Sequence, residues 1–183
     1  MRRLFSLLAA VLLSAFSVRA QSLSVSTNLA AYARLGTLNV EGGYAFSRHW
    51  SCHAGLNYNP FSFRRDGHVF RSRERSVRAG MRAWPWHRYS GWWMGAGLRW
   101  QEYNRGGFRS PETTEGDRLG AGLSVGYAHM LNAHFNLELG LGVWAGQDRY
   151  RRYACPECGV TEASGSKLFL LPDEWLLALT YIF

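Results

Sequence analysis

The stretch Leu119-Gly-Ala-Gly-Leu-Ser-Val-Gly-Tyr127 places an apolar residue at every odd position and glycine or serine at every even one. Residues 135–143 (FNLELGLGV) repeat this pattern, again with the apolar residues at odd positions. Successive side chains of a β-strand point to opposite faces, whereas a helix would require apolar spacings of three and four. Both stretches are therefore predicted to be strands with one apolar face and one small or polar face.

The same alternation recurs along the chain and predicts eight strands. The expected ranges are 22–33, 38–46, 50–58, 77–83, 92–100, 119–127, 135–143 and 173–183. Pro172 cannot donate to a sheet ladder, so the last strand is expected to begin after it. The connections 47–49, 85–91 and 131–134 are short, whereas 60–75, 103–118 and 148–172 are long and polar. This order is typical of the turns and external loops of a transmembrane β-barrel.

The first twenty residues have the pattern of a secretory signal peptide. Arg2 and Arg3 precede an uncharged apolar run at 4–17, and Val18-Arg19-Ala20 offers a small-x-small cleavage site. Fourteen residues are fewer than the roughly 20 that a membrane-spanning helix needs. No later stretch has the length and apolarity of such a helix. We therefore expect residues 1–20 to be removed and residues 21–183 to be exported as one barrel domain.

Composition excludes two broad classes of protein. The 183-residue chain is 47% hydrophobic and 19% charged, which is not the composition of a disordered protein. Basic residues outnumber acidic ones by 21 to 13, yet export makes nucleic acid an improbable partner. The predicted fold is an all-β, eight-stranded, antiparallel, up-and-down barrel of the outer-membrane type, and the predicted location is the outer membrane.

A soluble lipocalin-like barrel is the alternative, and the two classes differ in which face is apolar. The alternate face here is rich in Gly, Ser, Asn, Glu and Arg, which is unsuitable for a dry core. If both termini lie in the periplasm, aromatic residues of the apolar face gather at two rims, as lipid interfaces require. The periplasmic rim would hold Phe46, Trp50, Trp92, Tyr127, Phe135 and Tyr181, and the outer rim Tyr58, Trp100 and Trp175.

The interior face carries charges that must pair inside a narrow barrel. They are Glu41, Glu138, Arg78, Arg82 and Arg99, with His53, Asn57 and Gln101 beside them. We expect an Arg–Glu network that fills the lumen, because eight strands leave just enough room for side chains and an open channel needs more strands. The alternative is a lipid-modifying active site using His53 with Ser51 or Ser124, although no nucleophile motif is present.

Two predicted external loops carry further candidate sites. The first is basic and could bind anionic lipopolysaccharide or be merely solvated; its arginines are Arg64, Arg65, Arg71, Arg73 and Arg75. The second contains Cys155-Pro-Glu-Cys158. Export favours a disulfide between these two cysteines, while a metal site, a redox pair or free thiols remain open alternatives. Cys52 is expected to act as a small apolar residue, and no metal or cofactor is expected.

Several short segments resemble one particular family. They are Ser26-Thr27-Asn28-Leu29, Asn57-Tyr58-Asn59-Pro60-Phe61, Asn136-Leu137-Glu138, Cys155-Pro156-Glu157-Cys158-Gly159 and Tyr181-Ile182-Phe183. Together they resemble a domain-of-unknown-function family of small outer-membrane barrels from Gram-negative gut and oral anaerobes. The final Phe183 also resembles the signature that the barrel-assembly machinery reads. The family has no established activity, and some members are encoded near fimbrial genes.

Two functional hypotheses follow from these observations. The first is a non-enzymatic outer-membrane barrel with an envelope or surface-structure role through its external loops, a role that the family resemblance links to fimbrial assembly. Its expected partners are outer-membrane lipids, lipopolysaccharide, the assembly machinery and a surface protein of unknown identity. The second is a lipid-modifying enzyme with its site in the lumen or at the rim.

Overall fold

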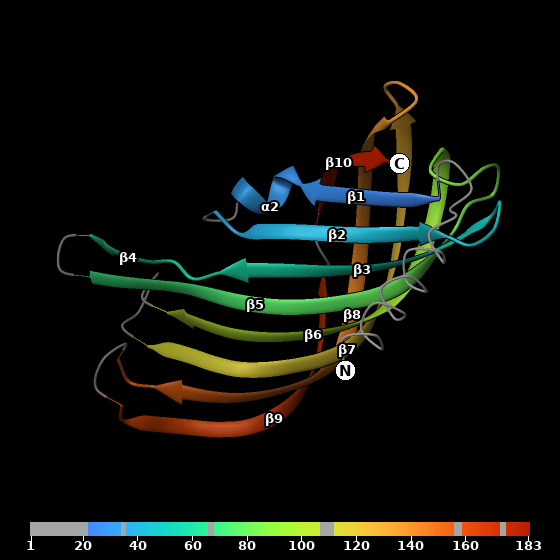
Figure 1. Ribbon diagram of the computed structural model, residues 1–183. Coiled ribbons are helices and arrows are strands. Elements are labelled where there is room, and N and C mark those ends of the chain that lie inside the picture. The colour runs from blue at the N-terminus through green and yellow to red at the C-terminus, as the bar shows by residue number, and fades with distance from the viewer. Residues whose placement is uncertain (1–21, 34–35, 66–67, 107–111, 156–158, 173–174) are drawn as a thin grey trace, which may run out of the picture.

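The computed structural model describes residues 22–33, 36–65, 68–106, 112–155, 159–172 and 175–183 (Figure 1). Within these ranges the chain is almost entirely β-structure, and the predicted signal peptide at 1–20 lies outside them. None of the helical structure described is long and apolar enough to cross a membrane.

Ten strands and one short helix follow one another in the described ranges. They are β1 (Leu23–Asn28), α2 (Leu29–Ala33), β2 (Leu38–Ala45), β3 (Trp50–Asn59), β4 (Ser62–Arg65), β5 (His68–Ala83), β6 (Gly91–Gly106), β7 (Thr113–Met130), β8 (Phe135–Tyr153), β9 (Thr161–Pro172) and β10 (Leu176–Ile182).

Eight of these strands form a closed antiparallel ring. Its order is β1-β2-β3-β5-β6-β7-β8-β10, and β10 returns to β1, with Ser24 opposite Ile182 on one side and Phe135 opposite Tyr181 on the other. β4 folds back on β5, and β9 pairs with the second half of β8. The predicted eight-stranded antiparallel barrel is thus confirmed, with β9 as an additional strand.

The strands extend well beyond their predicted ends. β5, β6, β7, β8 and β9 occupy most of the three ranges expected to be long loops, 60–75, 103–118 and 148–172. Backbone pairing continues there because a ladder satisfies N–H and C=O groups whether or not its side chains are apolar. The connections that remain are therefore much shorter than the sequence pattern suggested.

The first predicted strand also differs, because residues 29–33 form α2 instead of extended chain. The Asn28 side chain accepts a hydrogen bond from the Ala30 amide at 3.1 Å, which is the usual contact of a helix N-cap. The residues that follow, Leu29-Ala-Ala-Tyr-Ala33, include three alanines, the residue with the highest helix propensity. β1 therefore ends at Asn28.

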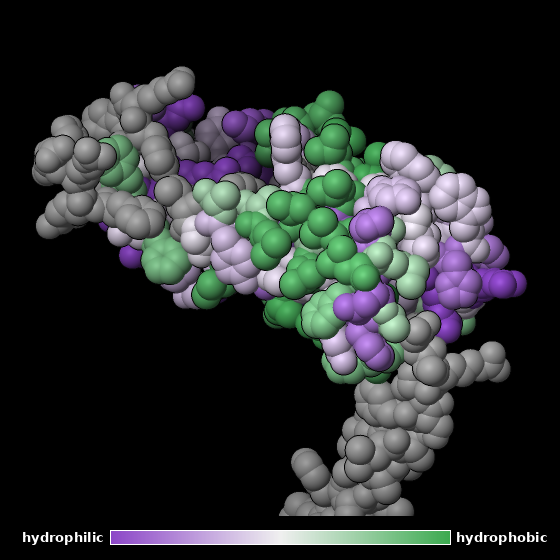
Figure 2. Space-filling model, turned by 90° about the horizontal axis from the view of Figure 1, so that it is seen from above, coloured by the Kyte–Doolittle hydropathy of each residue, from purple (hydrophilic) through white to green (hydrophobic). Residues whose placement is uncertain are grey.

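The two faces of the ring have opposite chemistry. Large apolar side chains midway along the strands point outward, and Leu98 and Leu123 are 65% and 66% exposed. Figure 2 shows hydrophobic side chains gathered on the middle of the displayed face, with hydrophilic residues toward the ends. Inward positions of the same strands hold buried polar and charged groups such as Glu41, Arg99 and Glu138. This is the face assignment that the alternation predicts.

Candidate functional site

The barrel has a turn end, where residues 46–49, 84–90 and 131–134 connect the strands, and a loop end opposite to it. An aromatic cluster fills the turn end. Trp84 is 1% exposed and packs against Trp93 and Tyr89, with ring centroids 6.3 Å and 5.7 Å away. Trp84 donates its indole N–H to Ser51 Oγ at 2.9 Å. This cluster closes the lumen at that end.

Tyr89 anchors the turn that carries the aromatic cluster. Its φ of 59° lies in the left-handed region, which reverses the direction of the backbone in the turn 84–90. The Tyr89 hydroxyl donates to the Ser22 carbonyl at 3.0 Å, and the Asn136 side-chain amide donates to the Tyr89 backbone carbonyl. Burial raises the pKa of Tyr89, so the hydroxyl remains a donor at neutral pH.

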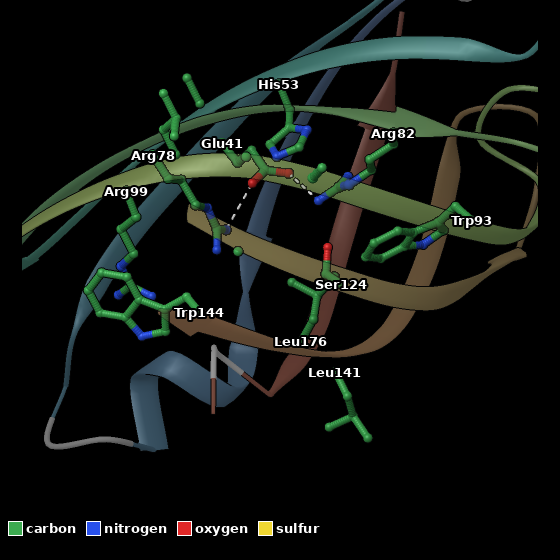
Figure 3. Close-up of a pocket in the computed structure, with 15 residues that line it drawn as sticks. Glu41, His53, Arg78, Arg82, Trp93, Arg99, Ser124, Leu141, Trp144 and Leu176 are labelled. Atoms are coloured by element: carbon green, nitrogen blue, oxygen red, sulfur yellow. Dashed lines mark hydrogen bonds and ion pairs between the residues drawn. The ribbon is translucent and has the colours of Figure 1, made fainter. Parts of the chain in front are cut away.

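A buried charge network, here called the turn-half network, adjoins this cluster at Trp93, which Figure 3 shows beside Arg82. Glu41 accepts from Arg82 at 2.7 Å and pairs with Arg78 at 2.9 Å. Arg82 also reaches Glu138 at 3.4 Å, and Thr180 donates to that carboxylate at 2.7 Å. The Arg82 guanidinium stacks 4.5 Å from the Trp93 ring centre. Four of the five predicted lumen charges therefore meet in one network.

The same region offers little support for a catalytic site. Among the described residues, no hydrogen bond joins His53 to Ser51 or Ser124, and the Ser51 hydroxyl oxygen accepts the indole N–H of Trp84. Figure 3 places His53 beside Glu41, whereas Ser124 enters the pocket from another strand. The cavity that they share measures about 60 Å³. This volume holds a few water molecules and is far below the roughly 300 Å³ of a small-molecule site.

The fifth predicted lumen charge, Arg99, belongs to a second network toward the loop end, here called the loop-half network. Glu74 pairs with Arg99 at 3.4 Å and also with Arg105. Asp148, which is fully buried, accepts from Tyr103 at 3.0 Å and from Arg118 at 3.1 Å. Sequence reasoning missed four of these residues: Glu74, Arg105, Arg118 and Asp148.

A cavity of about 520 Å³, here called the side cavity, adjoins the loop-half network. Arginine and amide side chains from β6 and β7 form one wall, and the other combines α2 with the β9–β10 junction. The full lining is Asn28, Ala30, Ala31, Arg99, Gln101, Arg105, Arg118, Trp144, Leu171, Pro172 and Trp175. It thus joins guanidinium groups to an apolar surface.

The side cavity begins where the ring stops closing. Asn28 is 2% exposed and bonds to both the Trp175 carbonyl and the Leu177 amide, at 3.1 Å each, at the end of the β1–β10 ladder. Beyond this point β9 pairs, within the described chain, with β8 alone. In Figure 1, β9 lies at the bottom of the view, while β1 and α2 lie at the top. The barrel wall is therefore interrupted beside the cavity.

The nine aromatic residues predicted to form two rims are all exposed, by between 36% and 73%. At the turn end, Trp92 packs on Tyr127 and Phe135 on Tyr181, with ring centroids 5.4 Å and 5.1 Å apart. Tyr58 and Trp100 lie on β3 and β6 toward the loop end. Trp175 differs from the others, because it precedes β10 and lines the side cavity.

The five arginines predicted to form one basic loop lie on strands. Arg71, Arg73 and Arg75 belong to β5, where Arg73 donates to Ser62 at 3.1 Å and Arg75 pairs with Glu102 on the outer surface. Arg64 and Arg65 belong to β4, and their side chains lie outside the described part of the structure. The structure thus places these residues on a strand hairpin instead of an irregular loop.

The predicted cysteine pair is only partly covered by the structure. Cys155 is disulfide-bonded, whereas Cys158 lies outside the described residues. Cys52 is a free, exposed cysteine on the outer face of β3. Within the described ranges, no three His, Cys, Asp or Glu side chains are grouped so that they could hold a metal ion.

Comparison with known proteins gives one match. A family model described as a protein of unknown function (DUF3575) matches residues 6–183. No curated protein and no solved structure matches the chain. Its function is therefore inferred from the geometry.

Proposed function

The chain belongs to the DUF3575 family, whose description names no function, and from its geometry we propose a non-enzymatic barrel of the Gram-negative outer membrane. Its role lies in the cell envelope and is exercised at the loop end. In the proposed orientation both chain termini and the turn end face the periplasm, and the outward apolar side chains contact lipid.

One observation carries the proposal: the exposed face is apolar and the enclosed face is charged. Leu98, Leu123 and Leu141 are more than half exposed, while Glu41 and Glu138 are 5% and 2% exposed. A soluble barrel would expose the charges and bury the leucines. Lipid around the ring makes both placements favourable, and the exposed aromatic rings at the turn end suit a membrane interface.

The proposed membrane location also accounts for three features of the sequence. The signal-peptide pattern at 1–20 would direct export, and the final Phe183 would be read by the barrel-assembly machinery. Lipids of the outer membrane would then surround the outer face. Lipopolysaccharide is the proposed contact of the arginines on β4 and β5.

A structural role is favoured over catalysis and over transport. The aromatic cluster closes the turn end, and the cavity beside His53 and Ser124 has room for only a few water molecules. Eight-stranded rings are filled by side chains, and open channels need about twice as many strands. The loop end is left as the surface for a partner, and the resemblance to a family with fimbrial neighbours makes a surface-structure protein our candidate.

A charge placed on the proposed lipid face tests this function. Leu123→Arg puts a guanidinium midway along β7, close to the midplane of the proposed bilayer. It should lower the free energy of unfolding by about 2–4 kcal/mol. Leu131→Arg is the matched control, because Leu131 is similarly exposed but lies in the turn 131–134. This second change should cost about 0–1 kcal/mol. Both variants are compared by urea unfolding in phospholipid vesicles.

Equal stability of the two variants would contradict a lipid-facing surface, because arginine is harmless on a face exposed to water. The native protein should also migrate faster on gels without heating, since a closed ladder resists detergent. Recovery in the soluble periplasmic fraction would reject the proposal outright.

A further inference from the structure

The side cavity has a cationic wall that can bind an anion. Arg99, Arg105 and Arg118 all line it. These three arginines share two carboxylates, Glu74 and Asp148, so one positive charge is left in excess. Arg118 is held in place by Asp148 and lies 4.0 Å from the Tyr103 ring centre, while Arg105 is held by Glu74. The side chain of Arg105 remains 36% exposed, so some of its N–H donors are available to a ligand. Guanidinium groups favour phosphate because they can bond two of its oxygens at once.

The opposite wall of the cavity is apolar. Leu171, Pro172 and Trp175 approach it from the β9–β10 junction, and Ala30 and Ala31 from α2. Trp175 is 73% exposed, and Leu168 and Leu170 on the outward face of β9 are 86% and 72% exposed. The apolar surface therefore continues from the cavity to the outside of the barrel. A ligand could keep a polar group at the arginines and a hydrocarbon chain along this path.

The shape of the cavity favours a single amphiphilic molecule. Its volume of about 520 Å³ lies within the roughly 300–1,000 Å³ of small-molecule sites. It borders the point where Asn28 terminates the β1–β10 ladder, and β9 has no second strand partner in the described chain beyond that point. The wall is thus interrupted at the level where the apolar lining meets the arginines.

We propose that the side cavity binds one phosphorylated lipid. Its anionic headgroup lies against Arg99, Arg105 and Arg118, and its acyl chain leaves through the interrupted wall beside β9. The inference rests on the proposed function only for the origin of the lipid, which is the membrane around the barrel. It gives the barrel a defined ligand class that the outward apolar face alone does not imply.

Titration of the purified full chain in a neutral detergent tests the proposal. The probes are a short-chain phosphatidic acid, a phosphatidylcholine with the same acyl chains, and inorganic phosphate, and binding is measured by calorimetry. We expect phosphatidic acid to bind at least tenfold more tightly than either of the other two. This expectation follows because only phosphatidic acid combines a net anionic headgroup with an apolar chain.

Two pairs of matched variants assign the binding to the cavity. Arg105→Gln should weaken phosphatidic acid binding about tenfold, as expected for one lost charge-assisted hydrogen bond. Arg48→Gln, in the exposed turn 46–49 at the opposite end of the barrel, should not change it. Leu171→Gln should weaken binding several-fold. Leu170→Gln, one residue earlier on the opposite face of β9, should leave it unchanged.

Each other outcome overturns a part of the assignment. Equal binding of phosphate and phosphatidic acid would mean a free anion site with no lipid chain, and equal binding of phosphatidylcholine would reject the anionic headgroup. Failure of all three probes to bind heat-modifiable protein would overturn the inference and leave the proposed membrane barrel intact. Lipid binding by a chain that proves soluble would instead reject only the proposed function.

Discussion

The turn half and the loop half of this barrel contain the same chemistry in different enclosures. In the turn half, Arg82 stacks on Trp93 and pairs with Glu41 inside a closed ring. In the loop half, Arg99 stacks 5.0 Å from the centre of the Trp144 ring and pairs with Glu74, but the wall beside them is interrupted. The two halves contain similar residue types. They differ because the pairing of β10 with β1 and β8 closes the ring only in the turn half, and the cavity lies beyond the end of that pairing.

Access to water differs between the two networks in the same way. The side chain of Arg82 is 10% exposed, and Glu41 and Glu138 are 6% and 2% exposed at their side chains. In the loop half, Glu74 is equally buried, but its partner Arg105 is 36% exposed. An unpaired charge in the turn half can therefore recruit little water, whereas Arg105 can be solvated when its partner is lost.

The largest expected effect follows from removing the central carboxylate of the turn-half network. Glu41→Ala leaves Arg78 and Arg82 without their shared partner in a space that admits few water molecules. It should lower the free energy of unfolding by about 3–5 kcal/mol, as is usual when one member of a buried ion pair is removed. Urea unfolding in detergent micelles measures the difference.

Glu74→Ala is the matched change in the loop half and sharpens the comparison. Arg105 can turn toward water, and the buried Arg99 keeps its contacts with Ser76 and the Trp144 ring. The loss should therefore be smaller, about 1–3 kcal/mol. If Glu74→Ala destabilised the barrel as much as Glu41→Ala, the two halves would be equally dry. The contrast between a filled lumen and an open cavity would then be wrong.

A smaller effect is expected at the boundary between the two halves. Asn28→Ala removes the side chain that bonds to the Trp175 carbonyl, the Leu177 amide and the Ala30 amide. It should cost about 1–3 kcal/mol, because it leaves partly buried backbone groups unsatisfied. Hydrogen exchange should speed up at Leu177 and Ala30, since the end of the ladder and the helix N-cap both depend on Asn28.

Asn132→Ala provides the control for this change. Asn132 also bonds through its side chain to two amides, those of His134 and Phe135, but it lies in an exposed turn at the opposite end. Its loss should leave exchange at Leu177 unchanged. Unchanged exchange at Leu177 in Asn28→Ala as well would contradict the assignment of the boundary to this residue.

Sequence periodicity predicted the turn half far better than the loop half. Apolar residues alternate with Glu41 and with Glu138, so the alternation predicts that both carboxylates point into the barrel. In the loop half the outward residues become polar, so the periodicity predicts loops there and does not identify Glu74, Arg105, Arg118 and Asp148. Continuing the inward parity of Arg99 through Gln101, Tyr103 and Arg105 would have identified that wall.

Other features depend on tertiary contacts that no periodicity records. Trp84 and Tyr89 lie in a turn and close the lumen only because that turn folds under the ring. The inward Trp93 fits because its neighbours are small, and a Cβ on Gly140 would lie 3.1 Å from its ring. The side cavity likewise follows from the divergence of β9 from β10, and Pro172 gives only the position of the break.

The smallest expected effect concerns the disulfide of Cys155. Cys155 follows the last residues of β8, well beyond the closed ring, and its predicted partner, Cys158, is only three residues away. A four-residue loop loses little closure entropy when it is cross-linked. Cys155→Ser should therefore change the free energy of unfolding by no more than about 2 kcal/mol. Mass spectrometry of protein alkylated without reductant checks the pairing, and two labelled thiols at Cys155 and Cys158 would reject it. A loss as large as that expected for Glu41→Ala would show that the connection beyond β8 supports the ring, and the two halves would then not be independent in stability.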